Sequence, residues 1–147
     1  VLDLVGFFED EYKEQVKELE KHSIAHFYGF QSDPRPFYIE ADCIVLPSYH
    51  EGMSNVILEA AATGRPVITS NIPGCRESVE NGKSGLLVEV KNKEMLYDAM
   101  KEMLHCSREE REQMGQAGRE KMEREFRKEV VVEKTVQSLR EDEKRDF

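Results

Sequence analysis

The sequence predicts an α/β fold, built on an open, doubly wound parallel sheet of about five strands and followed by a helical C-terminal segment. Short apolar runs alternate with amphipathic helical patterns over the first two-thirds of the chain. The runs are continuous rather than alternating with polar residues, which is typical of parallel strands that helices cover on both faces. The last third carries helical patterns alone. Together these observations indicate a Rossmann-like architecture.

The first third of the chain predicts two pairs of a strand and a helix. Residues 1–5 form an apolar run, and apolar residues then recur at i, i+4 and i+7 over residues 12–19, the spacing of an amphipathic helix. Residues 24–28 form the second apolar run. A second helical pattern begins with the Ser-Asp-Pro sequence at residues 32–34, which is a favourable helix start.

The middle of the chain predicts three more strands and one helix. The third apolar run covers residues 43–46 and stops at a proline. Ser54 is a suitable N-cap for a helix that reaches residue 62, with a glycine near its C-terminal end. Residues 66–69 and 85–88 provide the fourth and fifth runs, which complete the predicted sheet.

The C-terminal segment predicts three helices. An apolar stripe over residues 95–104 defines the first, and Ser107 with Glu110 forms a capping-box pattern that opens the second. A third helical pattern follows. Because no linker or repeat interrupts the chain, residues 1–147 are predicted to form a single domain that ends in the helices of residues 107–147.

The composition excludes several classes of function. The chain carries 21 Lys and Arg residues against 30 Asp and Glu, a net charge of −9, so nucleic acid is not an expected partner. No apolar run approaches the roughly 18 residues that span a bilayer. The three cysteines are an odd number without C-x-x-C spacing, and the histidines lack a spaced partner. These counts favour a reducing, cytoplasmic compartment and no metal site.

Candidate ligand-binding residues gather at one predicted strand end. Ligands of open α/β sheets bind outside the carboxyl ends of the strands. Residues 47–55 form the longest and most polar of these ends and lead straight into a helix N-terminus. The backbone N–H groups of Ser54, Asn55 and Val56 are suited to a phosphate there, and Gly52 is small enough to let an anion come close. The sequence therefore predicts an anion-binding turn.

Two glutamates flank this turn. Glu59 follows Ser54 by five residues, about 7.5 Å along a helix axis, which suits hydrogen bonds to hydroxyls one sugar length from a bound phosphate. Glu51 lies on the other side and can accept hydrogen bonds from a second polyol group. This arrangement fits a ligand built as sugar, diphosphate and sugar. In a chain this rich in Glu, two such acids also arise by chance, and a Glu near a helix start is commonly a partner of the helix dipole.

Six runs of residues follow one another in a recognisable order. They are Ala41-Asp42-Cys43-Ile44-Val45-Leu46-Pro47-Ser48, Glu51-Gly52-Met53-Ser54-Asn55-Val56-Ile57-Leu58-Glu59-Ala60, Gly64-Arg65-Pro66-Val67-Ile68, Pro73-Gly74-Cys75-Arg76-Glu77, Asn81-Gly82 and Gly85-Leu86-Leu87-Val88. In this order they resemble the C-terminal, donor-binding domain of family 4 (group 1) retaining glycosyltransferases, which have the GT-B fold. The resemblance covers roughly residues 1–105.

The resemblance implies a role for each candidate residue. Glu51 contacts hydroxyls of the donor sugar and is the candidate catalytic residue, whereas Glu59 contacts the ribose of a nucleotide diphosphate sugar. Phe30 and Gln31, at an earlier strand end, receive the base. The backbone that holds the diphosphate belongs to Gly52, Met53, Ser54, Asn55 and Val56. Transfer is expected to retain the configuration at the anomeric carbon and to need no bound metal.

The resemblance also implies partners. The donor is a nucleotide sugar, with a UDP-sugar favoured and no further cofactor, and the acceptor is a polyprenyl-linked or other lipid in bacterial surface polysaccharide or glycolipid synthesis. The N-terminal acceptor domain of the family, and the basic strand and loop that neutralise the diphosphate in many members, are missing from this sequence. The chain also opens in a strand pattern without an initiator Met. We therefore expect an inactive fragment of a cytoplasmic enzyme that is peripheral at the inner face of the membrane.

Three other classes of protein compete with this interpretation. A phosphoacceptor receiver domain has a similar length and order of elements, but it needs an aspartate at the end of the third strand, where this chain has Pro47 and Ser48. Half of a GT-B-type nucleotide-sugar epimerase and a non-catalytic nucleotide-binding module are better rivals. The two retained glutamates favour sugar transfer over both.

Overall fold

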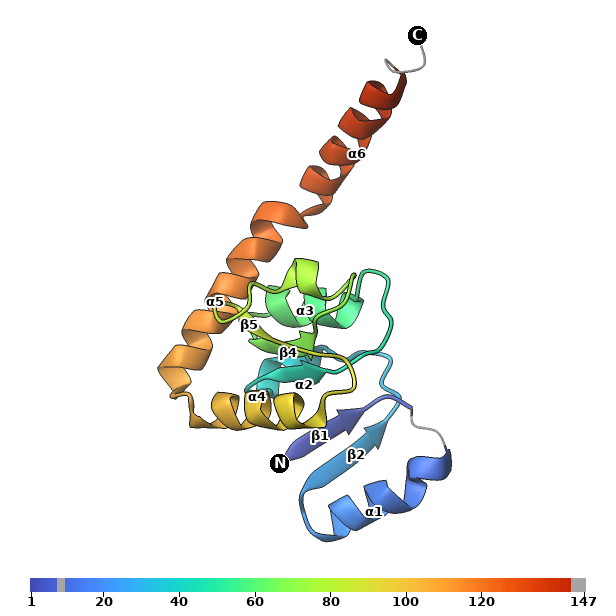
Figure 1. Ribbon diagram of the computed structural model, residues 1–147, viewed down its shortest axis with the longest axis vertical. Coiled ribbons are helices and arrows are strands. Elements are labelled where there is room, and N and C mark those ends of the chain that lie inside the picture. The colour runs from blue at the N-terminus through green and yellow to red at the C-terminus, as the bar shows by residue number, and fades with distance from the viewer. Residues whose placement is uncertain (8–9, 144–147) are drawn as a thin grey trace. The chain divides into compact units, whose positions relative to one another are not determined.

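The computed structural model describes residues 1–7 and 10–143. Its elements, shown in Figure 1, are β1 (Leu2–Val5), η1 (Asp10–Tyr12), α1 (Lys13–Lys21), β2 (Ala25–Gly29), α2 (Arg35–Glu40), β3 (Ile44–Leu46), α3 (Asn55–Ala62), β4 (Val67–Ser70), η2 (Arg76–Ser78), β5 (Gly85–Val88), α4 (Lys93–His105), α5 (Arg108–Glu125) and α6 (Lys128–Glu143). Every strand pair in this described part is parallel. The predicted α/β class is therefore confirmed.

The chain divides into two compact units, Val1–Phe37 and Tyr38–Phe147. Over the described residues the strands form two sheets, a two-stranded one of β1 and β2 and a three-stranded one in the order β3-β4-β5. The sequence predicts a single sheet of about five strands, whereas the structure has two smaller sheets, each with parallel strands. An apolar run marks a strand, but its pairing partner depends on residues far away in the sequence, so periodicity alone does not reveal this division.

The first unit is a small strand–helix–strand arrangement. β1 and β2 pair directly in parallel, with one irregularity in the register between Leu4 and Val5, and helix α1 connects them in the sequence. Ala25 at the start of β2 is fully buried. Phe7 and Phe30, which follow the carboxyl ends of the two strands, stack with their ring centroids 5.1 Å apart and their planes 8° from parallel.

The second unit has a core on each face of its sheet. β4 is the central strand and is buried along its whole length. Because side chains alternate between the faces of a strand, Val67 packs with Tyr38 and Ile57 on one face, while the next residue, Ile68, packs with Met103 on the other. Helix α3 covers the first face of the sheet, and α4 covers the second. This two-sided covering is the doubly wound arrangement that the continuous apolar runs predict.

Helix α5 approaches α3 closely through two glycines. A Cβ atom at Gly115 would lie 1.9 Å from the carbonyl oxygen of Gly64, and one at Gly118 would lie 3.6 Å from Ala61 Cβ. The predicted capping box is present at the start of α5, where the hydroxyl of Ser107 accepts from the backbone N–H of Glu110 at 3.2 Å. The two glycine contacts place α5 directly on α3, the helix that begins at the candidate site.

Helices α4, α5 and α6 together confirm the predicted helical C-terminal segment. In α6, four apolar side chains are exposed, namely Val131, Val132, Val136 and Leu139. Among the helices that the structure describes, none has both the length and the apolar character needed to cross a membrane.

Candidate functional site

The turn between β3 and α3, residues 47–54, lies at the carboxyl end of β3 and opens α3. Ser54 is the N-cap residue, with an extended backbone (φ −76°, ψ 107°). Its carbonyl accepts the first helical hydrogen bond, from the N–H of Leu58 at 3.1 Å. Its side chain makes no capping hydrogen bond, and its own N–H donates to the carbonyl of Gly74 at 3.2 Å. The Ser54 backbone is thus occupied on both sides.

Three backbone N–H groups remain free at this helix start. Asn55, Val56 and Ile57 precede the first residue that donates within the helix, and their N–H groups have no acceptor among the residues the structure describes. The sequence predicted free N–H groups at Ser54, Asn55 and Val56. The observed set is shifted by one residue because the Gly74 carbonyl, contributed by a different loop, already accepts from Ser54.

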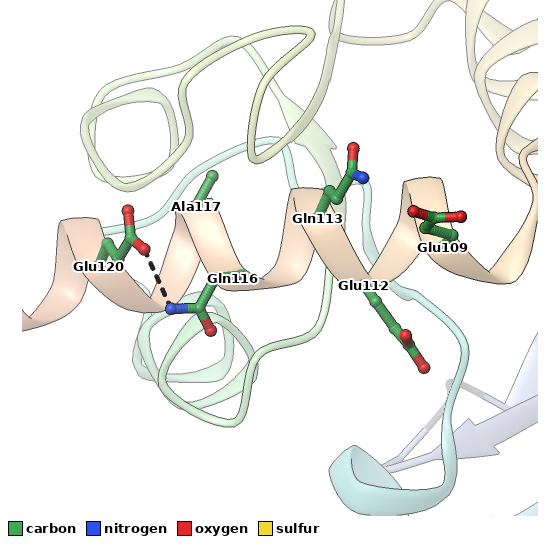
Figure 2. A pocket seen from close by; sticks show the side chains of 6 residues that line it. All are labelled: Glu109, Glu112, Gln113, Gln116, Ala117 and Glu120. Carbon is green, nitrogen blue, oxygen red and sulfur yellow. Dashed lines mark hydrogen bonds between the residues drawn. The ribbon is translucent and has the colours of Figure 1, made fainter.

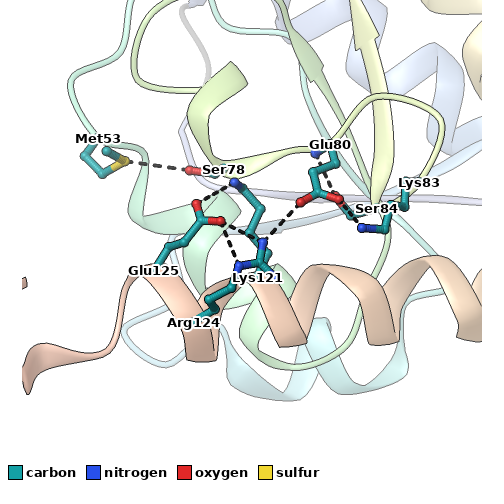
Figure 3. Close-up of polar contacts among 8 residues, drawn as sticks. All are labelled: Met53, Ser78, Glu80, Lys83, Ser84, Lys121, Arg124 and Glu125. Atoms are coloured by element: carbon teal, nitrogen blue, oxygen red, sulfur yellow. Dashed lines mark hydrogen bonds and ion pairs between the residues drawn. The ribbon is translucent and has the colours of Figure 1, made fainter. Parts of the chain in front are cut away.

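The loop after β4, residues 71–78, holds the other side of the turn. Gly74 has a φ of +87°, and a Cβ atom there would lie 1.4 Å from the carbonyl oxygen of Gly52, so only glycine permits this approach of two backbones. The N–H of Gly74 donates to the Glu77 carboxylate at 2.7 Å. The Ser78 hydroxyl donates to the sulfur of Met53 at 3.7 Å (Figure 3). The loop therefore contacts the turn at Gly52, at Met53 and, through the Gly74 carbonyl, at Ser54.

Each of the two predicted glutamates is held by one hydroxyl group. The Ser48 hydroxyl donates to Oε1 of Glu51 at 2.8 Å, and the Tyr38 hydroxyl donates to Oε2 of Glu59 at 3.0 Å. In each case the other carboxylate oxygen has no hydrogen-bond donor within the described part of the chain. Both acids therefore combine one fixed oxygen with one that is open to a ligand.

Tyr38 contacts a predicted site residue, although no sequence pattern indicates this role. It is 6% exposed and packs in the core beside α3. Burial raises the pKa of its hydroxyl to about 12, and the hydrogen bond to the Glu59 carboxylate acts in the same direction. Because 21 residues separate Tyr38 from Glu59, no local spacing rule connects them. Ser48, by contrast, precedes Glu51 by only three residues, a local spacing that could indicate their hydrogen bond from the sequence.

The structure brings together most of the predicted site residues. Glu51 is half-buried, Ser54 is buried and Glu59 is exposed. The remaining members of the turn and the first turn of α3 are also exposed, namely Gly52, Met53, Asn55 and Val56. Phe30 and Gln31 belong to the first unit, where Phe30 stacks on Phe7 and the Gln31 amide donates to the carbonyl of Tyr28 at 2.7 Å.

A positive charge also lies beside the turn. The ammonium of Lys91, which follows β5, lies 5.6 Å from the ring centroid of Tyr49, a cation–π contact. Lys91 has a φ of +63°, which is uncommon for a residue other than glycine. The contact places a cation beside Tyr49, a residue of the turn.

A separate shallow depression lies along α5 (Figure 2). Its lining consists of Glu109, Glu112, Gln113, Gln116, Ala117 and Glu120. The Gln116 amide donates to Glu120 at 3.0 Å across one helical turn. Because the charged side chains in this lining are all carboxylates, the depression does not suit a phosphate.

A parallel sheet covered on both faces, with free N–H groups at a helix start beyond a strand end, defines the class of Rossmann-like, ligand-binding α/β proteins. The family model for group 1 glycosyl transferases matches residues 1–121. The chain belongs to this glycosyltransferase family and has a GT-B-type, Rossmann-like fold.

Two curated relatives come from bacterial polysaccharide synthesis. The capsular polysaccharide biosynthesis glycosyltransferase CapM of Staphylococcus aureus is 33% identical over 102 residues, which cover 69% of this chain and 27% of CapM. The lipopolysaccharide core biosynthesis glycosyltransferase LpsE of Rhizobium meliloti is 31% identical over 113 residues, which cover 77% of this chain and 33% of LpsE. The chain thus spans about a quarter to a third of these relatives' length.

Solved structures show the same fold. Sucrose-phosphate synthase from Thermosynechococcus elongatus superimposes with a TM-score of 0.79 at 28% identity, over 95% of this chain and 38% of that enzyme. HepE of Anabaena, crystallised in complex with UDP-glucose, gives a TM-score of 0.78 at 22% identity, over 95% of this chain and 40% of HepE. These similarities extend the shared fold beyond the residues that the family model matches.

Proposed function

We propose that this chain binds the nucleotide diphosphate sugar donor of a retaining glycosyltransferase at the start of α3. The observation that carries the proposal is the set of three free N–H groups at Asn55, Val56 and Ile57, flanked by two carboxylates that each keep one oxygen open. Free N–H groups and the positive end of the helix dipole favour an anion, whereas carboxylates favour hydroxyl donors.

Each part of the donor has a proposed position. The diphosphate accepts from the free N–H groups of the exposed residues Asn55 and Val56, and Lys91 supplies a cation beside Tyr49 of the same turn. Glu59, about 7.5 Å along the helix axis from Ser54, accepts from the ribose hydroxyls. Glu51 accepts from hydroxyls of the transferred sugar. Phe30 and Gln31 remain the proposed contacts for the base.

A UDP-sugar is the proposed donor, with no further cofactor. HepE, whose fold this chain shares, was crystallised with UDP-glucose, and CapM and LpsE are named for capsule and lipopolysaccharide synthesis. We extend these observations to a bacterial surface polysaccharide or glycolipid pathway with a lipid-linked acceptor. Because the chain spans only 27% to 33% of those two relatives, we propose donor binding, rather than complete transfer, as the activity of these 147 residues.

Calorimetric titration with UDP and UDP-glucose tests the proposed roles. Glu59→Ala should weaken the binding of both ligands, since both carry the ribose. Glu51→Ala should weaken UDP-glucose alone, because UDP has no transferred sugar. Each lost hydrogen bond to a charged group should cost about 1.5–3 kcal/mol. Glu102→Ala, an exposed glutamate on α4, is the matched control and should change neither affinity.

Two results would contradict the proposal. A folded wild-type chain that binds no nucleotide sugar would remove donor binding altogether. Equal losses for UDP and UDP-glucose in both glutamate variants would reject the division of roles between Glu51 and Glu59.

A further inference from the structure

A hydrogen bond between two helices holds Glu59 at the candidate site. The Tyr38 hydroxyl, from α2, donates to Oε2 of Glu59, on α3, at 3.0 Å. The two residues differ sharply in environment, since Tyr38 is buried while Glu59 is exposed. An exposed carboxylate, which otherwise samples many rotamers, is thus attached to a buried donor.

Tyr38 is itself held at both ends. Its ring packs in the core cluster that includes Ile57 and Val67. Its backbone carbonyl accepts from Nε of Arg65 at 2.9 Å, and Nη2 of the same guanidinium donates to the carbonyl of Ile39. Arg65 follows the C-terminal end of α3, so it ties the last turn of α2 to the helix that carries Glu59. The hydroxyl therefore occupies a fixed position relative to α3.

We infer that Tyr38 is a positioning residue that orients the Glu59 carboxylate to accept hydrogen bonds from neighbouring hydroxyls of a bound nucleotide. The inference rests on the proposed function. It explains how the carboxylate that recognises the ribose hydroxyls is oriented before the ligand binds. Tyr38 donates to Oε2 and leaves Oε1 open, so a ligand hydroxyl finds an acceptor whose orientation is already set. The rotamer freedom that a free glutamate loses on binding is here lost on folding instead.

A tyrosine suits this role better than a cationic partner. Its neutral hydroxyl donates one hydrogen bond and leaves the negative charge of the carboxylate available to the ligand, whereas Lys or Arg would neutralise that charge. The raised pKa of Tyr38 keeps the hydroxyl protonated, and therefore a donor, throughout the neutral range. A buried aromatic ring also has few rotamers to lose.

The decisive variant is Tyr38→Phe, which keeps the ring in the core and removes only the hydroxyl. Its affinity is measured for UDP and for 2′,3′-dideoxy-UDP, which lacks the ribose hydroxyls. UDP binding should weaken about two- to tenfold, whereas dideoxy-UDP binding should stay at the wild-type value. In a Glu59→Ala background, Tyr38→Phe should have no further effect on either ligand. Tyr97→Phe, an exposed tyrosine on α4, is the matched control.

The two ligands distinguish positioning from general loss of structure. If Tyr38→Phe only loosens the fold, UDP and dideoxy-UDP weaken equally, and the positioning role is rejected. An unchanged UDP affinity in Tyr38→Phe rejects it too. A Glu59→Ala variant that still prefers UDP over dideoxy-UDP as strongly as the wild type shows that the proposed ribose contact itself is wrong. A wild-type chain that binds neither nucleotide overturns the proposed function, and this inference with it.

Discussion

The backbones of Gly52 and Gly74 lie close together at the candidate site, but the two positions differ in the room that they leave for a side chain. Gly74 has a positive φ of +87°, and an added Cβ would lie 1.4 Å from the carbonyl oxygen of Gly52. At Gly52, an added Cβ would meet no atom within 4 Å, and the backbone is outside the left-handed region. Gly74 is therefore needed for the fold, whereas Gly52 borders open space beside the turn where we propose that the diphosphate binds.

This contrast predicts two separable phenotypes. Gly52→Val should weaken UDP binding at an unchanged melting temperature, because its branched side chain extends into open space beside the anion path. Gly74→Ala should lower the free energy of unfolding by about 1–3 kcal/mol, since the backbone must move. Thermal melting and UDP titration on the same preparations separate the two effects. A folded Gly52→Val variant with wild-type affinity would remove this turn from the binding site.

Among the helices, α5 packs on α3 and so supports the helix that begins at the candidate site. Gly115 and Gly118 lie one turn apart on α5, yet their surroundings differ. A Cβ at Gly115 would come within 1.9 Å of the Gly64 carbonyl oxygen, which is backbone and cannot rotate away. A Cβ at Gly118 would make ordinary contacts of 3.6 Å with Ala61 and Ser84.

The two glycines on α5 should therefore respond to alanine with opposite signs. Helix propensity alone favours Ala over Gly by about 0.8–1 kcal/mol at either position. Gly118→Ala should gain most of this stability, because its Cβ fits. Gly115→Ala should instead lose about 1–3 kcal/mol, because the close contact forces the helices apart. Urea midpoints of the two variants provide the measurement, and a shift of the same sign in both would show that the α3–α5 contact is looser than described.

At the scale of the whole molecule, acidic side chains outnumber basic ones, and several carboxylates are stabilised in their charged form. Figure 3 shows one group, in which Lys121 donates to Glu125 at 2.6 Å and Arg124 reaches Glu80 at 3.2 Å. The hydrogen bond from Lys121 lowers the pKa of Glu125, and the one from Lys83 lowers the pKa of Glu80. Backbone N–H groups, its own first and then that of Gly74, lower the pKa of Glu77.

These shifts set the sign of the pH dependence. A carboxylate whose folded pKa is depressed stabilises the fold above its unfolded pKa, and that contribution disappears as the pH falls through the folded value. The urea midpoint should therefore be nearly constant from about pH 6 to 8 and fall below about pH 4.5. Glu125→Gln should make this acid decline shallower, since it removes one titrating group. A midpoint that rises on acidification would contradict the assignment.

Sequence patterns alone predict the α/β class, the five strands and the helix that begins after Ser54. They also place the two glutamates around the turn and reveal the family resemblance. These features are readable because they are local. An apolar run, a capping residue or an eight-residue spacing involves neighbours within two or three turns of chain, where periodicity and backbone sterics act directly.

How these elements come together at the site depends on contacts between distant segments. The hydrogen bond from the Ser54 N–H to Gly74 and the one from Tyr38 to Glu59 each join segments 20 or more residues apart. The division of the strands into two sheets likewise depends on pairing between segments that are distant in the sequence. Such contacts form because burying the faces of β4 brings α2, α3 and the loop after β4 together. Hydrogen-bond partners across that core follow from packing geometry, which no local pattern in the chain encodes.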